Sequence, residues 1–366
     1  MPSTKTMLHL AVAGLIAAWL TPGGGALAAS TSEMLYASLG NVLEAERSKV
    51  LEQGAKKEGT FVYIMTGPIG ANGKRHGDLF AKRYPFIKVE QTSTLGSQDG
   101  AARVVTEEKA GRHLTDLVST TVPDMSELIQ ENMLASNPTP FTQRVLAKYR
   151  PMLDPEHRWT PYQWSEHGIS YNKKIIGEAD APKDWTDLCN PALKGQVSFD
   201  PAETRFLVGL YYIFGQDLAK VEALLQCIGK NEPIIQRGHS SRMQLMLAGD
   251  HGVGGDQSLY FGESLRRKAP DKSPFVAVYT APLMAYAAGS AINKNAPHPH
   301  AAALFADWAL TEESQDYIAS LMRGPLAIPH PFVPETAQLV AFGYSDKKLE
   351  DALQRLWVTH VSAAKY

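Results

Sequence analysis

Two short polar stretches combine side chains that can bind an anion with the start of a predicted helix. Asp200-Pro201-Ala202-Glu203-Thr204-Arg205 follows the apolar run at 196–199, and Gly238-His239-Ser240-Ser241 opens a second helical pattern. The first N–H groups of a helix lack intrahelical partners and form the positive end of its dipole, which favours an anion. Arg205 can add a bidentate contact to a carboxylate or phosphate. The pattern predicts an anion site with these members: Glu203, Thr204, Arg205, His239 and Ser240.

Polar residues after three further apolar or glycine-rich runs extend this candidate site. Asp256 argues for a donor on the ligand, such as an amine, a hydroxyl or a metal, although aspartate also caps turns. Thr204 and Arg205 have structural interpretations too, as a helix cap and a solvated arginine, and His239 can simply begin its helix. The additional candidates are Thr66, Gly67, Thr120, Thr121, Asp256, Gln257 and Tyr260.

The sequence contains no motif of a known catalytic machinery. GxSxG, HExxH, GxxxxGK[ST] and GxGxxG are all absent, and each would place a nucleophile, a metal or a phosphate in a defined turn. The adjacent Glu107 and Glu108 face apart on a helix, so they do not form an acid–base pair. We therefore predict no enzyme activity, no cofactor and no metal site. Catalytic groups brought together from distant positions leave an exported hydrolase or lyase as an alternative.

Composition limits the class of protein. The chain has 366 residues, with 36 Lys+Arg against 38 Asp+Glu, which gives a net charge of −2. This balance argues against a partner such as nucleic acid, whose binding depends on neutralising phosphates. The apolar content of 44% and the charged content of 20% are typical of a globular chain,. The length suits about two domains.

The N-terminal segment resembles an export signal. Lys5 precedes an uncharged stretch, Leu8–Leu20, which is shorter than the roughly 20 residues that span a bilayer,. Ala26-Leu27-Ala28 then offers small residues for cleavage, so we predict a signal peptide over residues 1–28 and a soluble product outside the cytoplasm. An uncleaved anchor is the alternative.

The two cysteines, Cys189 and Cys227, can form one disulfide in an oxidising compartment,. Such a bond contributes on the order of 3 kcal/mol. Two buried free thiols explain the sequence equally well, because the sequence does not fix the distance between them.

The order of predicted elements indicates an α/β fold. Strands at 60–65, 86–90 and 116–120 alternate with helices at 73–84 and 101–111, which is the βαβ pattern of a parallel, doubly wound sheet,. The middle third repeats this logic, with a strand at 196–199, helices at 204–214, 218–227 and 240–248, and a short strand or loop at 252–255. Strands at 275–278 and 287–292 and helices at 301–310 and 312–322 follow. Turn-rich boundaries at 161–170 and 279–289 predict two lobes joined by extended crossings that act as a hinge.

Several stretches carry a resemblance to a family. They are Gly54–Gly59, the run Phe80–Val89 with its Tyr84-Pro85, Ile169–Lys174, Asp184–Gly195 and Asn295–Ala302. In their order and spacing they resemble the extracellular, periplasmic solute-binding proteins of ABC transporters, family 1, in the ferric-iron/anion-type branch. The resemblance also makes His298 and His300 part of a helix-opening turn.

The resemblance implies a type II periplasmic-binding-protein fold, in which each lobe is a doubly wound sheet flanked by helices. It places the N-terminal lobe at about 29–165 plus 280–325 and the C-terminal lobe at about 166–279 plus 326–366. It further implies a monomer that closes around a small-molecule ligand and docks on an ABC permease or on the sensor domain of a histidine kinase.

The resemblance departs from the iron-binding members at one point. Those members use adjacent tyrosines near the position of Gln257-Ser258, while Tyr211 and Tyr212 lie in a helical apolar run that is typical of a core,. We therefore predict a periplasmic component of an ABC import system that binds a small phosphorylated or carboxylated anion. A ferric-iron or other metal-binding protein is the alternative within the same family.

Overall fold

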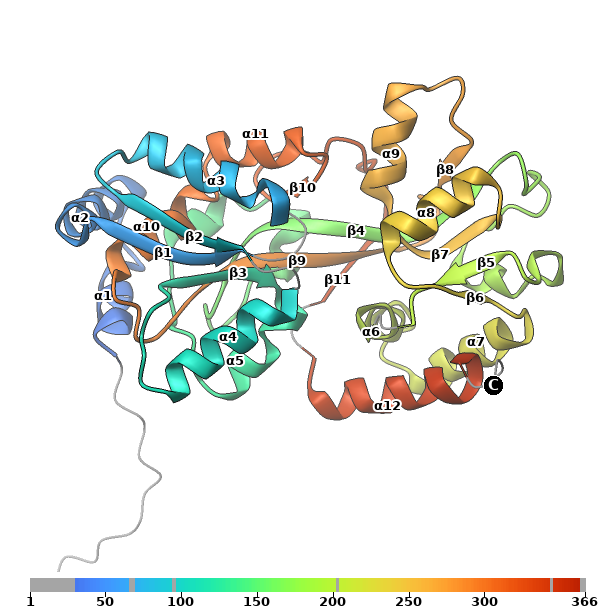
Figure 1. Cartoon of the computed structure of the whole chain (residues 1–366), viewed down its shortest axis with the longest axis horizontal. Coiled ribbons are helices and arrows are strands. Elements are labelled where there is room, and N and C mark those ends of the chain that lie inside the picture. The colour runs from blue at the N-terminus through green and yellow to red at the C-terminus, as the bar shows by residue number, and fades with distance from the viewer. Residues whose placement is uncertain (1–29, 66–69, 94–96, 202–203, 343–344, 363–366) are drawn as a thin grey trace, which may run out of the picture.

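The computed structural model describes residues 30–65, 70–93, 97–201, 204–342 and 345–362. The predicted signal peptide and the candidates Thr66, Gly67 and Glu203 lie outside these residues. The elements form two lobes side by side, joined by the long strands β4 (Thr160–Asn172) and β9 (Leu283–Ile292) (Figure 1).

The N-terminal lobe is built on three parallel strands. β1 (Thr60–Met65) pairs with β2 (Lys88–Ser93) on one side and with β3 (Leu117–Thr121) on the other. The right-handed crossovers expected of such a sheet are helices. The helices of this lobe are α1 (Thr31–Leu39), α2 (Glu44–Glu58), α3 (Gly70–Arg83), α4 (Ser97–Lys109), α5 (Ser126–Gln130), α10 (Pro299–Trp308) and α11 (Glu312–Ser320).

The C-terminal lobe has a second parallel core, in which β5 (Val197–Phe199) pairs with β6 (Ile234–Ile235) and with β7 (Val253–Ser258). Its helices are α6 (Thr204–Ile213), α7 (Leu218–Lys230), α8 (His239–Ala248), α9 (Leu259–Lys268) and α12 (Lys347–Trp357). The remaining strands are β8 (Phe275–Ala277), β10 (Gly324–Pro325) and β11 (Leu339–Phe342).

Strands β4 and β9 make the two sheets continuous. They pair with each other in antiparallel fashion from Thr160↔Ser290 to His167↔Met284. β9 also pairs with β3, and β4 with β7, so the strand order β2-β1-β3-β9-β4-β7-β5-β6 crosses from one lobe to the other. The α/β two-lobe prediction is confirmed, with the difference that the two expected sheets join at the crossing strands.

Local sequence explains where several elements begin and end. β1 has the predicted bounds, and α2 ends before Gly59, which takes the left-handed conformation with φ 69°,. The stretch 252–255 was expected to be a short strand or loop, and it belongs to the longer strand β7. The boundary at 161–170 was expected to be rich in turns, yet it lies within β4, which is buried along nearly its whole length.

Each lobe has its own apolar core. Aromatic rings of the N-terminal lobe meet between the sheet and α10, where Phe61 and Phe80 both pack on Phe305 at 5.1 Å between ring centroids. In the C-terminal lobe Phe199 and Trp357 pack on Phe206 of α6. Tyr211 and Tyr212 are half-buried and pack against this second core, which agrees with their core interpretation.

A buried ion pair fastens α2 to α10. Arg47 Nε lies 2.6 Å from Asp307 Oδ2, and both side chains are almost fully buried. Arg47 also donates to Asn137 Oδ1, and Thr139 donates to Asp307 Oδ1. Burial raises the pKa of Asp307, while the guanidinium of Arg47 acts in the opposite direction,.

Cys189 and Cys227 form a disulfide between the turn Trp185–Cys189 and α7, with their Cα atoms 5.5 Å apart. The side-chain amide of Asn231 donates to the backbone carbonyls of Leu188 and Asn190 and so joins the same two segments. The pairing that the sequence left open is therefore present.

His298 and His300 are held apart from each other by different carboxylates. His298 Nδ1 lies 2.9 Å from Asp116 Oδ2, and His300 Nδ1 lies 2.6 Å from Glu58 Oε1. They anchor the start of α10, as the turn interpretation expected. Among the described residues, no helix combines the length and the apolar character needed to cross a membrane.

Candidate functional site

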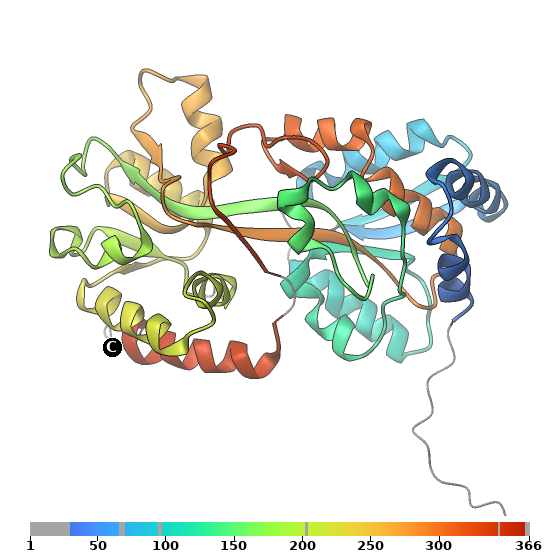
Figure 2. The ribbon, with the colours of Figure 1, turned by 180° about the vertical axis from the view of Figure 1, so that it is seen from behind.

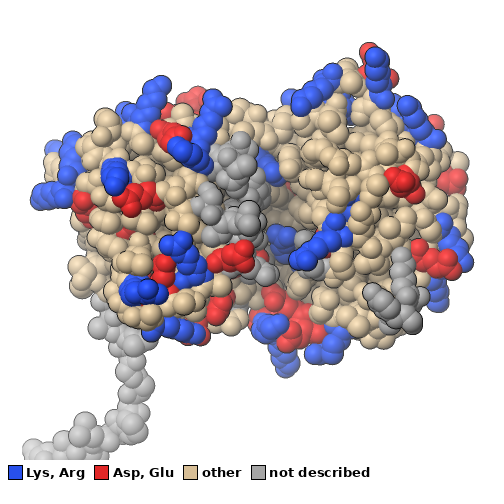
Figure 3. All heavy atoms as spheres, viewed as in Figure 1, with Lys and Arg blue, Asp and Glu red and all other residues tan. Residues whose placement is uncertain are grey.

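The site is built on the two crossing strands where the lobes meet. Ser165 of β4 is paired with Tyr286 of β9, and His167 with Met284. Directly paired residues point to the same face of a sheet and alternate residues share it, so these four side chains lie on one face. The ring centroids of His167 and Tyr286 are 4.5 Å apart at 75°. The molecular surface is hollowed between the lobes, with both basic and acidic side chains near the edge of the hollow (Figure 3).

The start of α8 brings His239 against this face. The ring of His239 stands edge-on to that of His167, with centroids 4.7 Å apart and an angle of 88°. The preceding Gly238 has φ 93°, a conformation that glycine adopts without strain, and its N–H donates to Asp200 Oδ2 at 2.6 Å,. The helix start is thus fixed in place beside β4.

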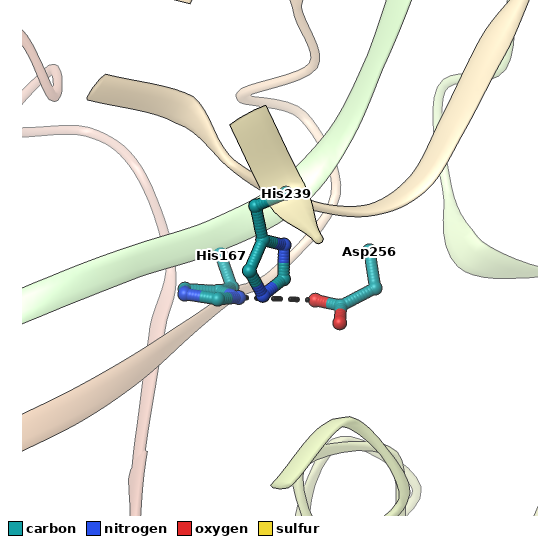
Figure 4. Close-up of side chains that lie close together, drawn as sticks. All are labelled: His167, His239 and Asp256. Carbon is teal, nitrogen blue, oxygen red and sulfur yellow. Dashed lines mark hydrogen bonds and ion pairs between the residues drawn. The ribbon is translucent and has the colours of Figure 1, made fainter. Parts of the chain in front are cut away.

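Asp256 joins the two histidines from β7. His167 Nδ1 lies 3.1 Å from Asp256 Oδ1, and Asp256 is fully buried (Figure 4). One ligand atom from each of His167, His239 and Asp256 lies within 4.8 Å of the others. By residue type and spacing this group resembles a site for a divalent transition metal.

Arg242 determines which ring nitrogen of His239 carries the proton. Its Nη2 lies 3.0 Å from His239 Nδ1 and also donates to the backbone carbonyl of Asp256, while Nη1 donates to the carbonyl of Ser198 at 3.1 Å. A guanidinium only donates, so His239 Nδ1 accepts, and the proton of the neutral ring is on Nε2. A metal ion needs a lone pair at that nitrogen. The arrangement therefore suits a hydrogen-bond donor rather than a metal ligand at His239.

The positive charge of Arg242 also affects the neighbouring His251. His251 is almost fully buried, and its pKa is lowered by burial and then by the positive charge of Arg242,. The guanidinium lies behind the cluster with no exposed surface. The wall of the C-terminal lobe at this point thus holds a buried cation, Arg242, next to the buried carboxylate of Asp256.

The start of α6 supplies a second cation. Thr204 is the first residue of α6, and Arg205 is half-buried with its guanidinium carbon 5.8 Å from the ring centroid of Tyr286. The first turn of α6 therefore brings Arg205 against β9, and the first residue of α8, His239, lies against β4. Helix starts and arginine both favour a negative ligand.

The remaining predicted residues are placed less centrally. Thr120 and Thr121 are buried at the end of β3, where Thr121 Oγ1 donates to Asp124 Oδ2 at 2.5 Å. Ser240 is exposed at the start of α8. Gln257 is fully buried against Gly254, and its side-chain amide has no hydrogen-bond partner among the described residues.

Tyr260 lies on the opposite side of β4 from the cluster. Its backbone N–H donates to Glu166 Oε1 at 2.7 Å, and the guanidinium of Arg323 lies 3.5 Å from the centroid of its ring. Glu166 directly precedes His167, and successive side chains of a strand point to opposite faces. The structure therefore brings Arg205, His239 and Asp256 together at one face, and it separates Tyr260 from them.

Sequence reasoning missed His167 and Arg242. A weak signal for His167 is present, because Gln163, Ser165 and His167 are polar at every second position of the strand, with Glu166 as an exception to the alternation. That period marks a polar face. Arg242 follows His239 by three residues on a helix, a spacing that places both on one side.

Comparisons with known proteins settle the family. The model of the family described as bacterial extracellular solute-binding protein matches residues 113–341. The chain belongs to this family. No curated protein sequence is matched.

Solved structures of periplasmic binding proteins share the fold. Iron-bound HitA from Pseudomonas aeruginosa superposes with a TM-score of 0.61 at 18% identity, over 84% of this chain and 99% of that one. PotD from Streptococcus pneumoniae, a spermidine/putrescine ABC transporter substrate-binding protein, has a TM-score of 0.65 at 15% identity, over 84% and 99%. AfuA from Actinobacillus pleuropneumoniae, with fructose-6-phosphate bound, has a TM-score of 0.59 at 18% identity, over 83% and 98%.

Proposed function

We propose that this member of the family is the periplasmic receptor of an ABC import system and that it binds a small phosphorylated or carboxylated anion between its lobes. The observation that carries the proposal is the pair of helix starts that face the crossing strands. Arg205 at α6 approaches Tyr286 of β9, and His239 at α8 approaches His167 of β4. An anion held by both helix starts would rest on both strands.

This geometry links binding to closure. The two strands are the parts of the sheet that connect the lobes, so a solute that contacts them and a helix start favours one relative position of the lobes. The lobe limits we propose remain 29–165 plus 280–325 and 166–279 plus 326–366. The closed receptor would dock on an ABC permease and release its solute unaltered. A sensor domain is the alternative partner.

The chemistry of the described site supports an anion over ferric iron. The hydrogen bond from Arg242 makes His239 Nε2 a donor, and Arg205 adds a second donor-bearing cation,. The hydroxyl of Tyr286 contacts the sulfur of Met284 at 3.3 Å. The cluster brings together two imidazole rings and one carboxylate, whereas hard Fe(III) prefers anionic oxygen ligands,. The similar structures were solved with iron or fructose-6-phosphate, or carry a polyamine-transport name, so they do not decide the ligand.

The test is a calorimetric titration of purified protein with fructose 6-phosphate, citrate, spermidine and ferric citrate. We expect binding of a phosphorylated or carboxylated compound, recovered unchanged after release. Arg205→Ala should weaken it about 10- to 150-fold, the range for a hydrogen bond to a charged group. Arg205→Lys should lose less, and Lys194→Ala, which alters an exposed ion pair with Glu232, should bind like the wild type. Binding of spermidine alone, or turnover of the solute, would contradict the proposal.

A further inference from the structure

A second polar cluster joins the lobes on the side of β4 that faces away from the candidate site. Arg323 follows α11 of the N-terminal lobe, and Tyr260 is the second residue of α9 in the C-terminal lobe. The guanidinium of Arg323 is stacked over the ring of Tyr260, 3.5 Å from its centroid. Arg323 is 8% exposed, so this cation–π contact is largely shielded from water, where such contacts are strongest,.

The same α9 helix is tied to the segment that follows Arg323. Arg267 donates to the carbonyl oxygen of Pro331. His330 Nε2 lies 3.5 Å from Glu166 Oε2, and both side chains are fully buried. His330 Nδ1 accepts two backbone N–H groups, from the second and third residues after it, so the proton of the neutral ring is on Nε2, facing Glu166,. We call Arg323, Tyr260, Glu166, His330 and Arg267 the back contact, in which the pair Arg323–Tyr260 crosses the lobe limits proposed above.

Apolar packing on this face is equally close. A Cβ atom at Gly168 of β4 would lie 2.7 Å from Leu283 Cδ2 and 3.5 Å from Leu259 Cδ1, so both leucines pack close to the backbone of this glycine. Leu259 begins α9, and Leu283 begins β9. Both belong to the apolar cluster of the N-terminal lobe, which therefore continues behind the crossing strands into α9.

The back contact and the candidate site lie on opposite sides of the hinge. Glu166 and His167 are successive residues of β4, and they point to opposite faces,. Seen from behind, β4, β9 and the segment leading into β11 lie nearest the viewer (Figure 2). If the lobes rotate about an axis that passes between these two faces, narrowing the gap on the His167 face widens the gap on the Glu166 face.

We propose that the back contact sets the resting separation of the lobes, with Arg323 and Tyr260 as positioning residues for the solute site. This inference rests on the proposed closure of the lobes around a solute. The stacked pair is made in the described conformation and is stretched when the lobes close, so part of the free energy of solute binding is spent on parting it. Residues that never touch the solute thus lower the affinity of the site.

The test compares solute-free variants by electron–electron resonance between spin labels. Labels at Arg103 of α4 and Lys220 of α7 report on different lobes, and the native cysteines are bonded to each other and remain unlabelled. We expect Arg323→Ala and Tyr260→Ala to move the distance distribution to shorter values. Loss of a shielded cation–π contact should change the ratio of closed to open molecules about 5- to 30-fold. The radius of gyration from X-ray scattering should fall accordingly.

Tyr260→Phe is the matched control, because it retains the ring and should leave the distribution unchanged. Arg323→Gln keeps a polar side chain without the charge, and it replaces Arg323→Ala if circular dichroism shows that the alanine variant does not fold. Distributions of folded Arg323 and Tyr260 variants that coincide with the wild type, or that move to longer distances, overturn the proposal. Because no solute is added, failure of the anion-binding proposal does not affect this result.

Discussion

Replacing both Cys189 and Cys227 with serine should destabilise the protein mainly through its unfolded chain. The two residues are 38 positions apart. In the chain-entropy model, closing a loop of that length removes about 13 cal/mol/K from the unfolded state, or about 3.9 kcal/mol at 25 °C. We therefore expect the double variant to lose about 3–4 kcal/mol of unfolding free energy.

Contacts around the disulfide should keep the folded structure nearly unchanged when the bond is removed. The amide of Asn231 donates to Leu188 and Asn190 at 2.9 Å each and keeps the turn against α7 without the covalent bond. Trp185 of the same turn is fully buried and donates to the carbonyl of Pro282. These hydrogen bonds thus keep the turn at 185–189 in place in the folded variant that lacks the disulfide.

The assay is equilibrium unfolding in guanidinium chloride, followed by tryptophan fluorescence, for the wild type with and without reductant and for the double serine variant. Reduced wild type and the variant should share one midpoint, below that of the oxidised protein. Solute binding by the folded variant should be unchanged. A loss of less than about 1 kcal/mol would show that the unfolded chain is already compact around this loop and would refute the entropy argument.

Two further predictions concern buried ionisable groups in the N-terminal lobe. Arg47→Met leaves the carboxylate of Asp307 buried beside a single hydroxyl, and chemical unfolding should show a loss of about 3–5 kcal/mol, which a second change, Asp307→Leu, largely restores. Burial lowers the pKa of His76 to about 3, below its unfolded value of roughly 6.5,. As the pH falls below about 6.5 the unfolded chain binds a proton at His76 before the folded protein does, so this contribution to the unfolding free energy is fully present above about pH 6.5 and decreases down to about pH 3,. Unfolding measured across this pH window should not show the decrease in His76→Leu. The control His113→Gln, which changes an exposed histidine, should still show it.

The sequence specified elements whose signal is local. The run Thr60–Met65 is continuous, rich in strand-forming residues and buried, and it forms β1 with the predicted bounds,. The stretch 161–170 contains Pro161 and Gly168 and was read as rich in turns. It is instead a strand, because neighbouring strands from distant parts of the chain pair with both of its edges. No local sequence pattern predicts that β7 and β9 are its partners.

The same distinction applies to the candidate site. Arg205 and His239 were predicted because each stands at the start of a helix, which the chain near them specifies. His167 was missed because it meets Asp256 only through the pairing of β4 with β7, 89 residues apart. Tyr260 follows Asp256 closely in sequence, yet the start of α9 turns it to the opposite face, toward Glu166. Proximity in sequence did not give proximity in space at that turn.

The order in which the chain completes its first lobe bears on its synthesis. Arg47 pairs with Asp307, which is synthesised 260 residues later. The edge of β3 stays unpaired until β9 has been synthesised. A nascent chain emerging from the ribosome therefore carries half a lobe with an open strand edge and an uncovered apolar face for most of its translation. Until β9 and Asp307 have been synthesised, the first lobe cannot complete its sheet or its buried ion pair.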